Sequence, residues 1–374
     1  MTGPTPIRVL LACQPLHSGV PQHVLDLVRS LDPARFSLAL ACPRESVLWD
    51  ALAGSGVELH AISPARRPGP ADVRTLVTLL RLVRRFDVIH GHSAKAGFLS
   101  RLAAALTGRR DRCVFTPHGW SFWSADGAAG RLYLALERLA ARWCRTIVTL
   151  SGDERDAGLA KGVGRAGLYA VIPNGVDLTR FAAPPEPVPG RVVVVGRFAP
   201  PKRHDLVLQA FADVRGAYPD AELWLVGDGE GRPAAERLAA TLGVAEATRF
   251  LGVRDDVPEL LAHATCAVLA SDYEGCPLAP IEAMAAGVPV VATGVGGVPE
   301  VVEHGVAGIV TAPGSASALA EALAGVLGDP AGAAQMGAAG RARARARFSR
   351  ERMAAATAAI YVQAAAGPSP VRDS

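Results

Sequence analysis

The stretch SDYEGCPLAPIEAMAAGVPVVATGVGGVPE, residues 271–300, decides the fold of this chain. Its pattern predicts a loop, a short helix, a buried strand and a glycine-rich turn, in that order. Pro277 and Pro280 are tolerated in the first turn of a helix, because the N–H groups that they lack would have no intrahelical partner there. Gly287 followed by Pro289 ends the helix, and the valines around them form the strand. A helix that leads directly into a buried strand is typical of an α/β protein.

Two carboxylates flank the start of this helix. Glu274 lies in the loop before it, and Glu282 lies about one turn inside it. The N–H groups of Cys276, Leu278 and Ala279 are placed to point at a ligand, with the positive end of the helix behind them. Each carboxylate can accept two hydroxyl hydrogen bonds. The segment therefore predicts a polyhydroxylated ligand with an anionic part; the alternative is an amphipathic helix with solvated Glu side chains.

The same segment resembles a known family. Glu274 and Glu282, with EGCPLAPIEAMAAGVPVVAT around them, resemble the Glu-x7-Glu segment of the retaining glycosyltransferases of family four. That family has the GT-B fold, an α/β architecture of two Rossmann-like, doubly wound parallel-sheet domains facing a cleft. The resemblance implies that Glu274 contacts the donor sugar and Glu282 the ribose of the nucleotide. It also implies donor contacts from Gly275, Cys276, Pro277 and Leu278.

The composition fits a globular chain of two domains. The chain has 374 residues, of which 50% are hydrophobic and 20% charged, which excludes a disordered protein. Its six cysteines show no CxxC spacing, so a reduced, cytoplasmic setting is expected and no metal cluster is predicted. The N-terminal residues read as a first strand rather than a signal peptide, and no apolar run is long enough to span a membrane.

Charge is distributed unevenly along the chain. Residues 1–183 contain 23 Lys and Arg against 14 Asp and Glu, whereas residues 184–374 contain 16 against 21. A basic N-terminal half can contact an anionic inner-membrane surface or a phosphorylated acceptor. Nucleic acid is not the expected partner, because aromatic residues make up only 5% of the chain and do not alternate with the basic ones. A solvated, arginine-rich surface is the alternative explanation.

Strands and helices alternate along the chain, which predicts parallel sheets covered on both faces. In the first half the predicted strands are 7–13, 37–41, 57–62, 87–90, 113–116 and 146–150, and the predicted helices are 21–31, 47–53, 72–85, 95–106 and 129–143. In the second half the predicted strands begin with 192–195 and continue with 223–226, 250–252 and 267–269.

A proline-rich segment, 183–189, is the clearest linker. It divides the chain into an N-terminal acceptor-side domain, 1–183, and a C-terminal nucleotide-sugar-binding domain, 184–349. The resemblance implies that the last helix, 350–366, crosses back to the N-terminal domain. The alternate arginines just before it, Arg341, Arg343, Arg345 and Arg347, predict a solvated helix face.

The first strand leads through Ser18 and Gly19 into a helix, an arrangement that can place an anion at the helix N-terminus. The resembling family has a Gly-Gly pair here, close to the donor diphosphate. This chain keeps only Gly19 of that pair, which can adopt the left-handed conformation. Gly19 is therefore predicted to bind the donor.

Polar residues follow two other strands, where ligands of open parallel sheets bind. His90, His92 and Lys95 come after one strand and are candidates for acceptor binding, although histidines of this kind are more often structural. His118 follows the next strand in the string TPHGW, which resembles the His-Gly loop of the family. The resemblance implies that His118 lies beside the donor sugar and is a catalytic residue.

Arg197 and Lys202 follow the first strand of the second half and resemble the pair that holds the donor diphosphate. The leaving nucleoside diphosphate gains negative charge as the glycosidic bond breaks, so two fixed cations stabilise the transition state more than the ground state. Arg197, Lys202 and Glu274 are therefore assigned catalytic as well as binding roles. No cofactor and no metal are expected, and the turn 227–231 lacks the dinucleotide fingerprint.

The resemblance implies transfer of a hexose, with retention, from a UDP- or GDP-sugar. The strings VIHGHSAKAG and FTPHGW resemble those of bacterial enzymes that build cell-surface polysaccharides, so a lipid-linked glycan acceptor is expected at the cytoplasmic face of the membrane. A glycosyltransferase acting on a secondary metabolite, a non-catalytic sugar-nucleotide-binding protein, and a GT-B epimerase or phosphorylase are the alternatives.

Overall fold

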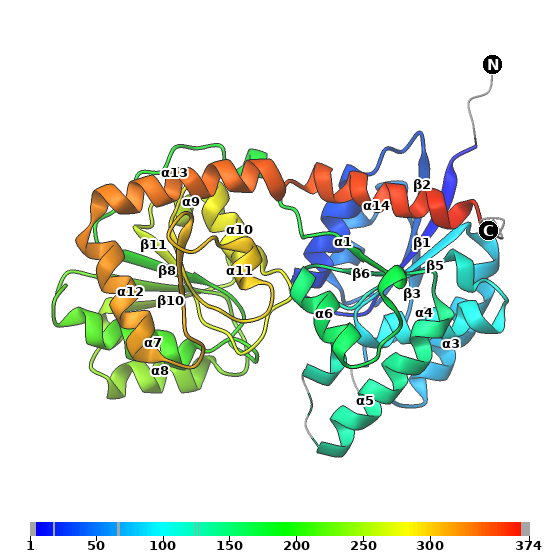
Figure 1. The fold of residues 1–374 in the computed structure, drawn as a ribbon, viewed down its shortest axis with the longest axis horizontal. Coiled ribbons are helices and arrows are strands. Elements are labelled where there is room, and N and C mark those ends of the chain that lie inside the picture. The colour runs from blue at the N-terminus through cyan, green and yellow to red at the C-terminus, as the bar shows by residue number, and fades with distance from the viewer. Residues whose placement is uncertain (1–4, 18, 66–67, 124, 126, 368–374) are drawn as a thin grey trace. The chain divides into compact units, whose positions relative to one another are not determined.

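The chain forms two compact units in the computed structural model (Figure 1), which describes residues 5–17, 19–65, 68–123, 125 and 127–367. The N-terminal unit comprises Met1–Asn174 and Arg350–Ser374, and the C-terminal unit comprises Gly175–Ser349. Each unit has its own parallel sheet. We describe each unit by itself.

The division falls at 174/175, earlier in the chain than the predicted boundary at 183/184. Val176 pairs with Ser349, and the Phe181 carbonyl accepts a hydrogen bond from Arg341 at 3.0 Å, so this segment packs with the C-terminal unit. The proline-rich segment is also attached there, because the Glu186 and Val188 N–H groups donate to carbonyls at residues 262 and 263. The segment is part of the C-terminal unit and not an open linker.

The sheet of the N-terminal unit has seven strands in the order β3-β2-β1-β4-β5-β6-β7, and all neighbours are parallel. The strands are β1 Ile7–Cys13, β2 Phe36–Cys42, β3 Glu58–Ala61, β4 Val88–His92, β5 Cys113–Thr116, β6 Thr146–Thr149 and β7 Tyr169–Val171. The helices are α1 Gly19–Ser30, α2 Val47–Leu52, α3 Ala71–Leu82, α4 Ala94–Leu106, α5 Gly127–Ala140, α6 Gly152–Ala160 and α14 Arg350–Ala365.

Strand β1 is buried on both faces, as expected for a central parallel strand. Its side chains alternate between two clusters: Leu11 packs with α1, α2 and α14, whereas Leu10 packs with α3 and α4. Helix α14 belongs to the first cluster, where Met353 and Tyr361 are almost fully buried. The last helix of the chain thus completes the core that the first strand begins.

The same unit buries an ion pair. Arg101 of α4 donates to Glu137 of α5 at 2.7 Å, and the side chains are 0% and 5% exposed. The Arg101 Nε donates to the Gly97 carbonyl at 3.1 Å, and its guanidinium lies 3.6 Å from the centre of the Phe115 ring. A side chain at Gly97 would collide with that ring, because a Cβ there would lie 2.2 Å from Phe115 Cε2.

The sheet of the C-terminal unit has six parallel strands in the order β10-β9-β8-β11-β12-β13. The strands are β8 Arg191–Val195, β9 Glu222–Val226, β10 Thr248–Gly252, β11 Cys266–Leu269, β12 Val290–Thr293 and β13 Gly308–Thr311. The helices are α7 His204–Arg215, α8 Arg232–Thr241, α9 Val257–Ala262, α10 Leu278–Ala285, α11 Val298–Val301, α12 Ala316–Gly328 and α13 Pro330–Arg347.

The strand order reverses once in each sheet, between β1 and β4 and between β8 and β11. Ligands of open α/β sheets bind beyond the carboxyl ends of the strands at such a reversal. The loops that follow β8 and β11 therefore mark the candidate site of the C-terminal unit. In the N-terminal unit the corresponding position lies at the ends of β1 and β4.

The alternate arginines of α13 are not a uniformly solvated face. Arg341 donates to the carbonyls of Ala285 and Phe181, and Arg343 donates to Val301 and pairs with Glu303 at 2.6 Å. Only the last two of the four arginines are exposed. Arg341 attaches α13 to the end of α10 and to the chain that enters the unit, and Arg343 attaches it to the end of α11.

Among the described residues, no helix combines the length and the apolar character needed to cross a membrane.

Candidate functional site

The loops after β8 and β11 bring together two residues that are far apart in the sequence. Lys202 Nζ lies 2.5 Å from Glu274 Oε1, and both side chains are largely buried. Ser271 Oγ donates to the same carboxylate oxygen at 2.7 Å. Lys202 and Ser271 also form an antiparallel bridge. The reversal of strand order therefore carries a cation and a carboxylate that contact each other, both of which the sequence predicts to be site residues.

A buried threonine of β12 fixes the start of the loop that carries Glu274. Thr293 Oγ1 accepts a hydrogen bond from the Ser271 N–H at 3.0 Å and donates to the Ser271 carbonyl at 3.1 Å. Thr293 is fully buried and Ser271 is 1% exposed. The next residue, Asp272, donates its N–H to the Pro201 carbonyl, which ties this loop to the one after β8.

Replacing Thr293 by valine is expected to lower the free energy of unfolding by about 1–3 kcal/mol, because a buried N–H and carbonyl of Ser271 lose their partner. Thr293→Ser keeps the hydroxyl and is the matched control. Urea unfolding followed by circular dichroism measures both variants. A loss in Thr293→Ser without a loss in Thr293→Val would mean that the methyl group, and not the hydroxyl, matters.

The glycine-rich turn after β12 also holds the loop. The Gly297 N–H donates to the Glu274 carbonyl at 3.0 Å. Gly296 has a positive φ of 50°, and a Cβ there would lie 2.0 Å from the Glu274 carbonyl oxygen. Only glycine fits so close to this backbone. The turn therefore supports Glu274 through backbone contact.

Helix α10 begins and ends where the sequence predicts. Pro277 is its N-cap with extended backbone, Leu278 is its first residue, and Gly287 follows it with φ of 77°. The N–H groups of Leu278 and Ala279 lie in the first turn, where they have no intrahelical acceptor. Glu282 is half-buried, about one turn inside the helix. The geometry of the predicted Glu-x7-Glu segment is thus confirmed, whereas the roles of its residues stay predictions.

Arg197 follows β8 and is exposed. Burial, and then the Glu274 carboxylate, raise the pKa of the Tyr273 hydroxyl, while the charge of Arg197 opposes that rise. Arg197 and Glu274 thus act on the same side chain. The glycine turn after β9 packs against this loop, because a Cβ at Gly227 would lie 2.1 Å from the Gly196 carbonyl oxygen.

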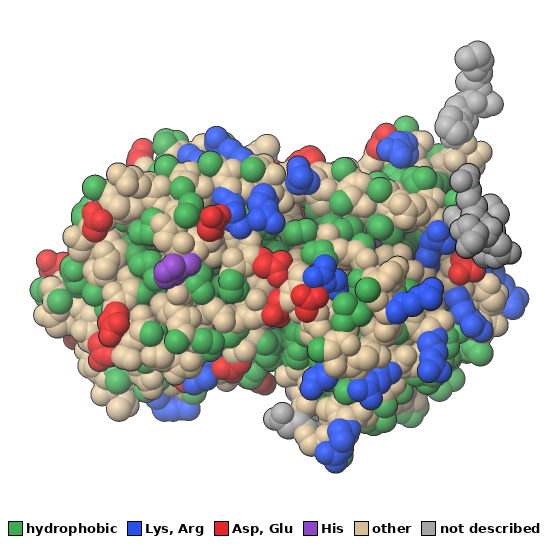
Figure 2. All heavy atoms as spheres, in the orientation of Figure 1, with side chains coloured by type: hydrophobic (Ala, Val, Ile, Leu, Met, Phe, Trp, Pro, Cys, Tyr) green, Lys and Arg blue, Asp and Glu red, His purple; other side chains and the backbone are tan. Residues whose placement is uncertain are grey.

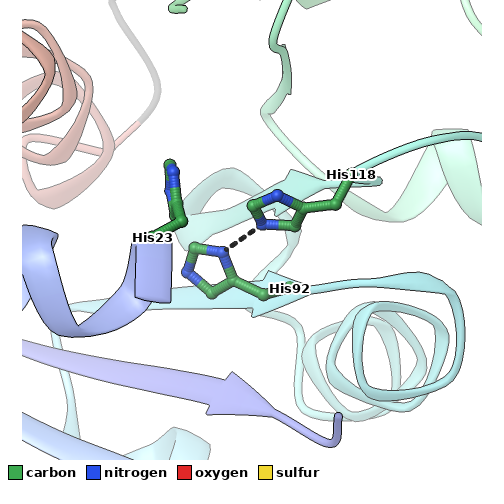
Figure 3. A group of neighbouring side chains, drawn as sticks. All are labelled: His23, His92 and His118. Carbon is green, nitrogen blue, oxygen red and sulfur yellow. Dashed lines mark hydrogen bonds between the residues drawn. The ribbon is translucent and has the colours of Figure 1, made fainter. Parts of the chain in front are cut away.

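Histidines gather at the reversal of strand order in the N-terminal unit. His92 Nδ1 at the end of β4 lies 3.0 Å from Nε2 of His118, which follows β5 (Figure 3). His23 of α1, which the sequence analysis did not select, lies with its ring centre 4.7 Å from that of His118. Its Nδ1 is 2.8 Å from Asn174 Oδ1. Burial lowers the pKa of His23 to about 4 and that of His92 and His118 well below the usual value.

The three predicted acceptor residues are engaged with the protein. His90 is 1% exposed; its Nδ1 lies 2.7 Å from the Tyr361 hydroxyl and its Nε2 2.8 Å from Thr116 Oγ1. His92 is fully buried. Lys95 pairs with Asp72 at 2.5 Å, and its side chain is 16% exposed. His90 is better explained as a core residue that connects β4 to α14 than as an acceptor contact.

Gly19 is the first residue of α1 and is exposed. Ser18, its predecessor in the predicted donor loop, lies outside the described residues.

Glu154 of α6 is a further residue that the sequence analysis did not select. It is fully buried, and its two carboxylate oxygens accept the N–H groups of Gly119 at 2.6 Å and Leu150 at 2.7 Å. The adjacent His118 has a positive φ of 55°, which is uncommon for a side chain of this size. Glu154 therefore holds the turn that carries His118. The Ser-x-x-Glu spacing from Ser151, typical of a helix start, was the available signal.

Burial raises the pKa of Glu154 to about 7, against the effect of its two N–H donors. The folded chain thus binds this proton more tightly than the unfolded chain does. Its contribution to stability is largest below the unfolded pKa and declines as the pH rises through 7. Between pH 5 and 7 the stability of wild type relative to Glu154→Gln should fall by about 2 kcal/mol. Urea unfolding at several pH values measures this difference, and a constant difference would contradict the assignment.

Two family models match the chain. The model of a glycosyl transferase 4-like domain matches residues 18–175, and the model of glycosyl transferases group 1 matches residues 179–343. The chain belongs to glycosyltransferase family four. The resemblance on which the sequence analysis relies is confirmed.

Relatives of this glycosyltransferase use activated sugars. A UDP-Gal:alpha-D-GlcNAc-diphosphoundecaprenol alpha-1,3-galactosyltransferase of Escherichia coli is 29% identical over 76% of this chain and 78% of its own length. A GDP-mannose-dependent alpha-(1-6)-phosphatidylinositol monomannoside mannosyltransferase of Mycolicibacterium smegmatis is 32% identical over 70% and 73%. The crystal structure of Anabaena HepE with UDP and glucose superposes with a TM-score of 0.82 at 23% identity, covering 94% and 98% of the two chains. The glycosyltransferase has the GT-B fold and uses a nucleotide-sugar donor.

Proposed function

We propose that this glycosyltransferase transfers a hexose with retention from a UDP- or GDP-sugar to a lipid-linked glycan intermediate of a cell-surface polysaccharide, at the cytoplasmic face of the membrane. The observation that supports the nucleotide-sugar donor in this proposal is the contact between Lys202 and Glu274 beside the N-terminus of α10. A cation, a carboxylate and helix N–H groups together match the diphosphate and the hydroxyls of such a donor.

The contact suggests how donor binding proceeds. Without the donor, Glu274 neutralises the Lys202 ammonium, so neither charge is left unpaired in a largely buried position. The diphosphate takes the place of the carboxylate on Lys202, with Arg197 as the second cation. Ser271 remains hydrogen-bonded to Glu274 Oε1 and keeps the carboxylate in place. Glu274 is then able to accept hydrogen bonds from the sugar hydroxyls, and Glu282 from the ribose.

The fixed cations take the part that a divalent metal plays in other transferases. Arg197 and Lys202 stabilise the charge that develops on the leaving diphosphate, and no cofactor is required. Turnover is expected to be unchanged after treatment with EDTA and dialysis, measured as release of nucleoside diphosphate. A loss that added Mg²⁺ restores would contradict this part of the proposal.

His118 is the proposed catalytic residue of the N-terminal unit, with its imidazole hydrogen-bonded to the donor sugar. The imidazole is neutral at pH 7, since burial lowers its pKa, and His92 fixes its orientation at 3.0 Å. We propose a displacement in which the acceptor attacks the anomeric carbon from the same side as the one from which the leaving group departs. Retention then follows without a covalent intermediate.

The acceptor assignment is supported by the names of the relatives, since one acts on a diphosphoundecaprenol-linked sugar and another on a phosphatidylinositol monomannoside. The N-terminal unit offers a surface for a membrane. Figure 2 shows Lys and Arg side chains over the part of this unit that contains α3, α4 and α5. The exposed residues of α3 and the turn after it are Val73, Arg74, Val77, Arg81, Arg84 and Arg85. Apolar and basic side chains side by side suit an anionic lipid surface.

The experiment that tests the function begins with UDP-, GDP- and ADP-sugars, each assayed for slow hydrolysis without acceptor. The best donor is then offered with undecaprenyl-diphosphate-linked sugars and with soluble acceptors, and the anomeric configuration of the product is read by NMR. Transfer to the lipid-linked sugar with an α linkage from an α donor supports the proposal. Transfer only to soluble acceptors supports the secondary-metabolite alternative, and donor binding without turnover supports a non-catalytic protein.

A further inference from the structure

Three histidines from three separate elements converge in the N-terminal unit. His23 comes from α1, His92 from the end of β4 and His118 from the turn after β5 (Figure 3). One ring nitrogen of each lies within 4.8 Å of the others. The proposed transfer reaction uses His118, with His92 fixing its orientation. It does not explain why His23 is buried beside them.

The hydrogen bond of His23 leaves one of its nitrogens available. Asn174 Oδ1 can only accept, so His23 Nδ1 donates to it at 2.8 Å. The lone pair of His23 therefore lies on Nε2. A histidine that donates one N–H to a protein oxygen and directs the other nitrogen at an ion is the usual arrangement of a metal ligand.

His92 and His118 already approach the spacing of two ligands. Their facing nitrogens are 3.0 Å apart, and one of the two carries the proton of that contact. His92 Nε2 is buried and has no hydrogen-bond partner in the described part of the chain. An ion can bind to both His92 Nδ1 and His118 Nε2 only if neither carries a proton. Where His92 Nδ1 is the donor of the contact, its proton moves to His92 Nε2. No proton leaves the protein, and no existing hydrogen bond of Nε2 is lost.

The size of the cluster fits a tetrahedral ion after a small movement. Nitrogens bound at about 2.0–2.1 Å to one ion lie about 3.4 Å apart. The widest pair, at most 4.8 Å apart, must approach by up to about 1.4 Å, which side-chain rotation supplies. His118 is only half-buried, so an ion has a way in. His90 is no ligand, because both its nitrogens have partners, but its ring lies 3.9 Å from that of His92 and holds it in place.

We propose that His23, His92 and His118 form a binding site for one divalent transition-metal ion, with Zn²⁺ as the best match for three imidazoles and an open fourth position. The bound ion takes His118 Nε2 from its contact with His92, and so changes the orientation and the charge of the imidazole that the proposed function places at the donor sugar. Zinc therefore inhibits transfer instead of supporting it. This inhibition rests on the proposed role of His118, whereas the binding does not.

Binding is tested on the full chain after removal of metals with EDTA. Isothermal titration with Zn²⁺ should show one equivalent bound, and Co²⁺ should give the intense visible bands of a tetrahedral nitrogen site. His23→Gln and His92→Gln should each weaken Zn²⁺ binding at least tenfold, roughly the smallest loss expected for a ligand. His263→Gln, in the other unit, is the matched control and should bind as wild type does. No binding, or equal affinity in all four proteins, overturns the site.

If the histidine variants do not fold, Asn174→Ala provides a second test of the site. It removes no ligand, yet it should weaken Zn²⁺ binding because His23 loses its orientation. Circular dichroism of every variant shows whether it is folded. An Asn174→Ala protein that is folded and binds Zn²⁺ as wild type does would overturn the assigned orientation of His23.

Inhibition is measured separately, as the ratio of rates with and without Zn²⁺ for each protein. Wild type should be inhibited at the concentrations that fill the site, and His23→Gln only at concentrations at least about tenfold higher. If the wild type binds one Zn²⁺ and keeps its full rate, the proposed inhibition is wrong, whereas the proposed binding site stands. A metal-free wild type without any transfer activity would instead count against the proposed function.

Discussion

Glu274→Ala and Lys202→Ala are each expected to lower kcat/KM at least about a hundredfold, since each removes one preorganised charge that acts on the leaving diphosphate or the sugar. In Glu274→Ala the ammonium of Lys202 loses a partner 2.5 Å away and the sugar loses a hydrogen-bond acceptor. In Lys202→Ala the carboxylate remains close to where the diphosphate binds and repels it. Steady-state release of nucleoside diphosphate from the best donor measures both.

The two losses should not add. Because Lys202 and Glu274 contact each other, the double variant is expected to lose less than the sum of the two free-energy changes. Glu246→Ala, an exposed carboxylate of the same unit, is the control and should keep the wild-type rate. Near-normal turnover in either single variant would place the donor elsewhere.

Glu137→Ala is expected to lower the free energy of unfolding by about 3–5 kcal/mol, because it leaves the buried charge of Arg101 without a counter-ion. Arg101 is fully enclosed, with its other contacts to the Gly97 carbonyl and the Phe115 ring. Neither contact neutralises a full charge in an apolar surrounding. Urea unfolding monitored by tryptophan fluorescence and by circular dichroism measures the change.

Two variants show whether charge is the cause. Replacing both partners, as Arg101→Met with Glu137→Leu, should recover most of the lost stability, because similar volumes of apolar atoms refill the space. Asp256→Ala breaks an exposed pair with Arg254 and should leave the urea midpoint close to that of wild type. If Glu137→Ala behaves like Asp256→Ala, the buried pair contributes little.

The sequence predicted those elements whose apolar pattern is strong and whose ends carry turn residues. The expected strand at 7–13 is β1, the expected strand at 113–116 is β5, and α10 ends at Ala285, two residues before the expected stop at Gly287. Strands β7 and β13 were not predicted. Each has only three or four residues and is largely half-buried, so neither shows a long apolar run.

The sequence predicted the site residues from separate motifs, but it did not predict which of them contact each other. Lys202 and Glu274 were each selected from local patterns, but 72 residues separate them, and only the order of the strands places them together. His23, Asn174 and Glu154 were missed for a related reason. They lie in a helix or turn whose local sequence has an ordinary structural explanation, and their chemistry appears only when distant strands are neighbours.

The packing of α14 in the core begun by β1 constrains how the chain matures on the ribosome. The C-terminal unit is one continuous stretch, so it can fold as soon as Ser349 has left the exit tunnel. The N-terminal unit cannot complete the apolar cluster that contains Leu11 until Met353 and Tyr361 have been translated. The part of the protein made first is therefore the last to be finished, and the side chains of β1 and α1 in this cluster stay uncovered by α14 until that helix has been made.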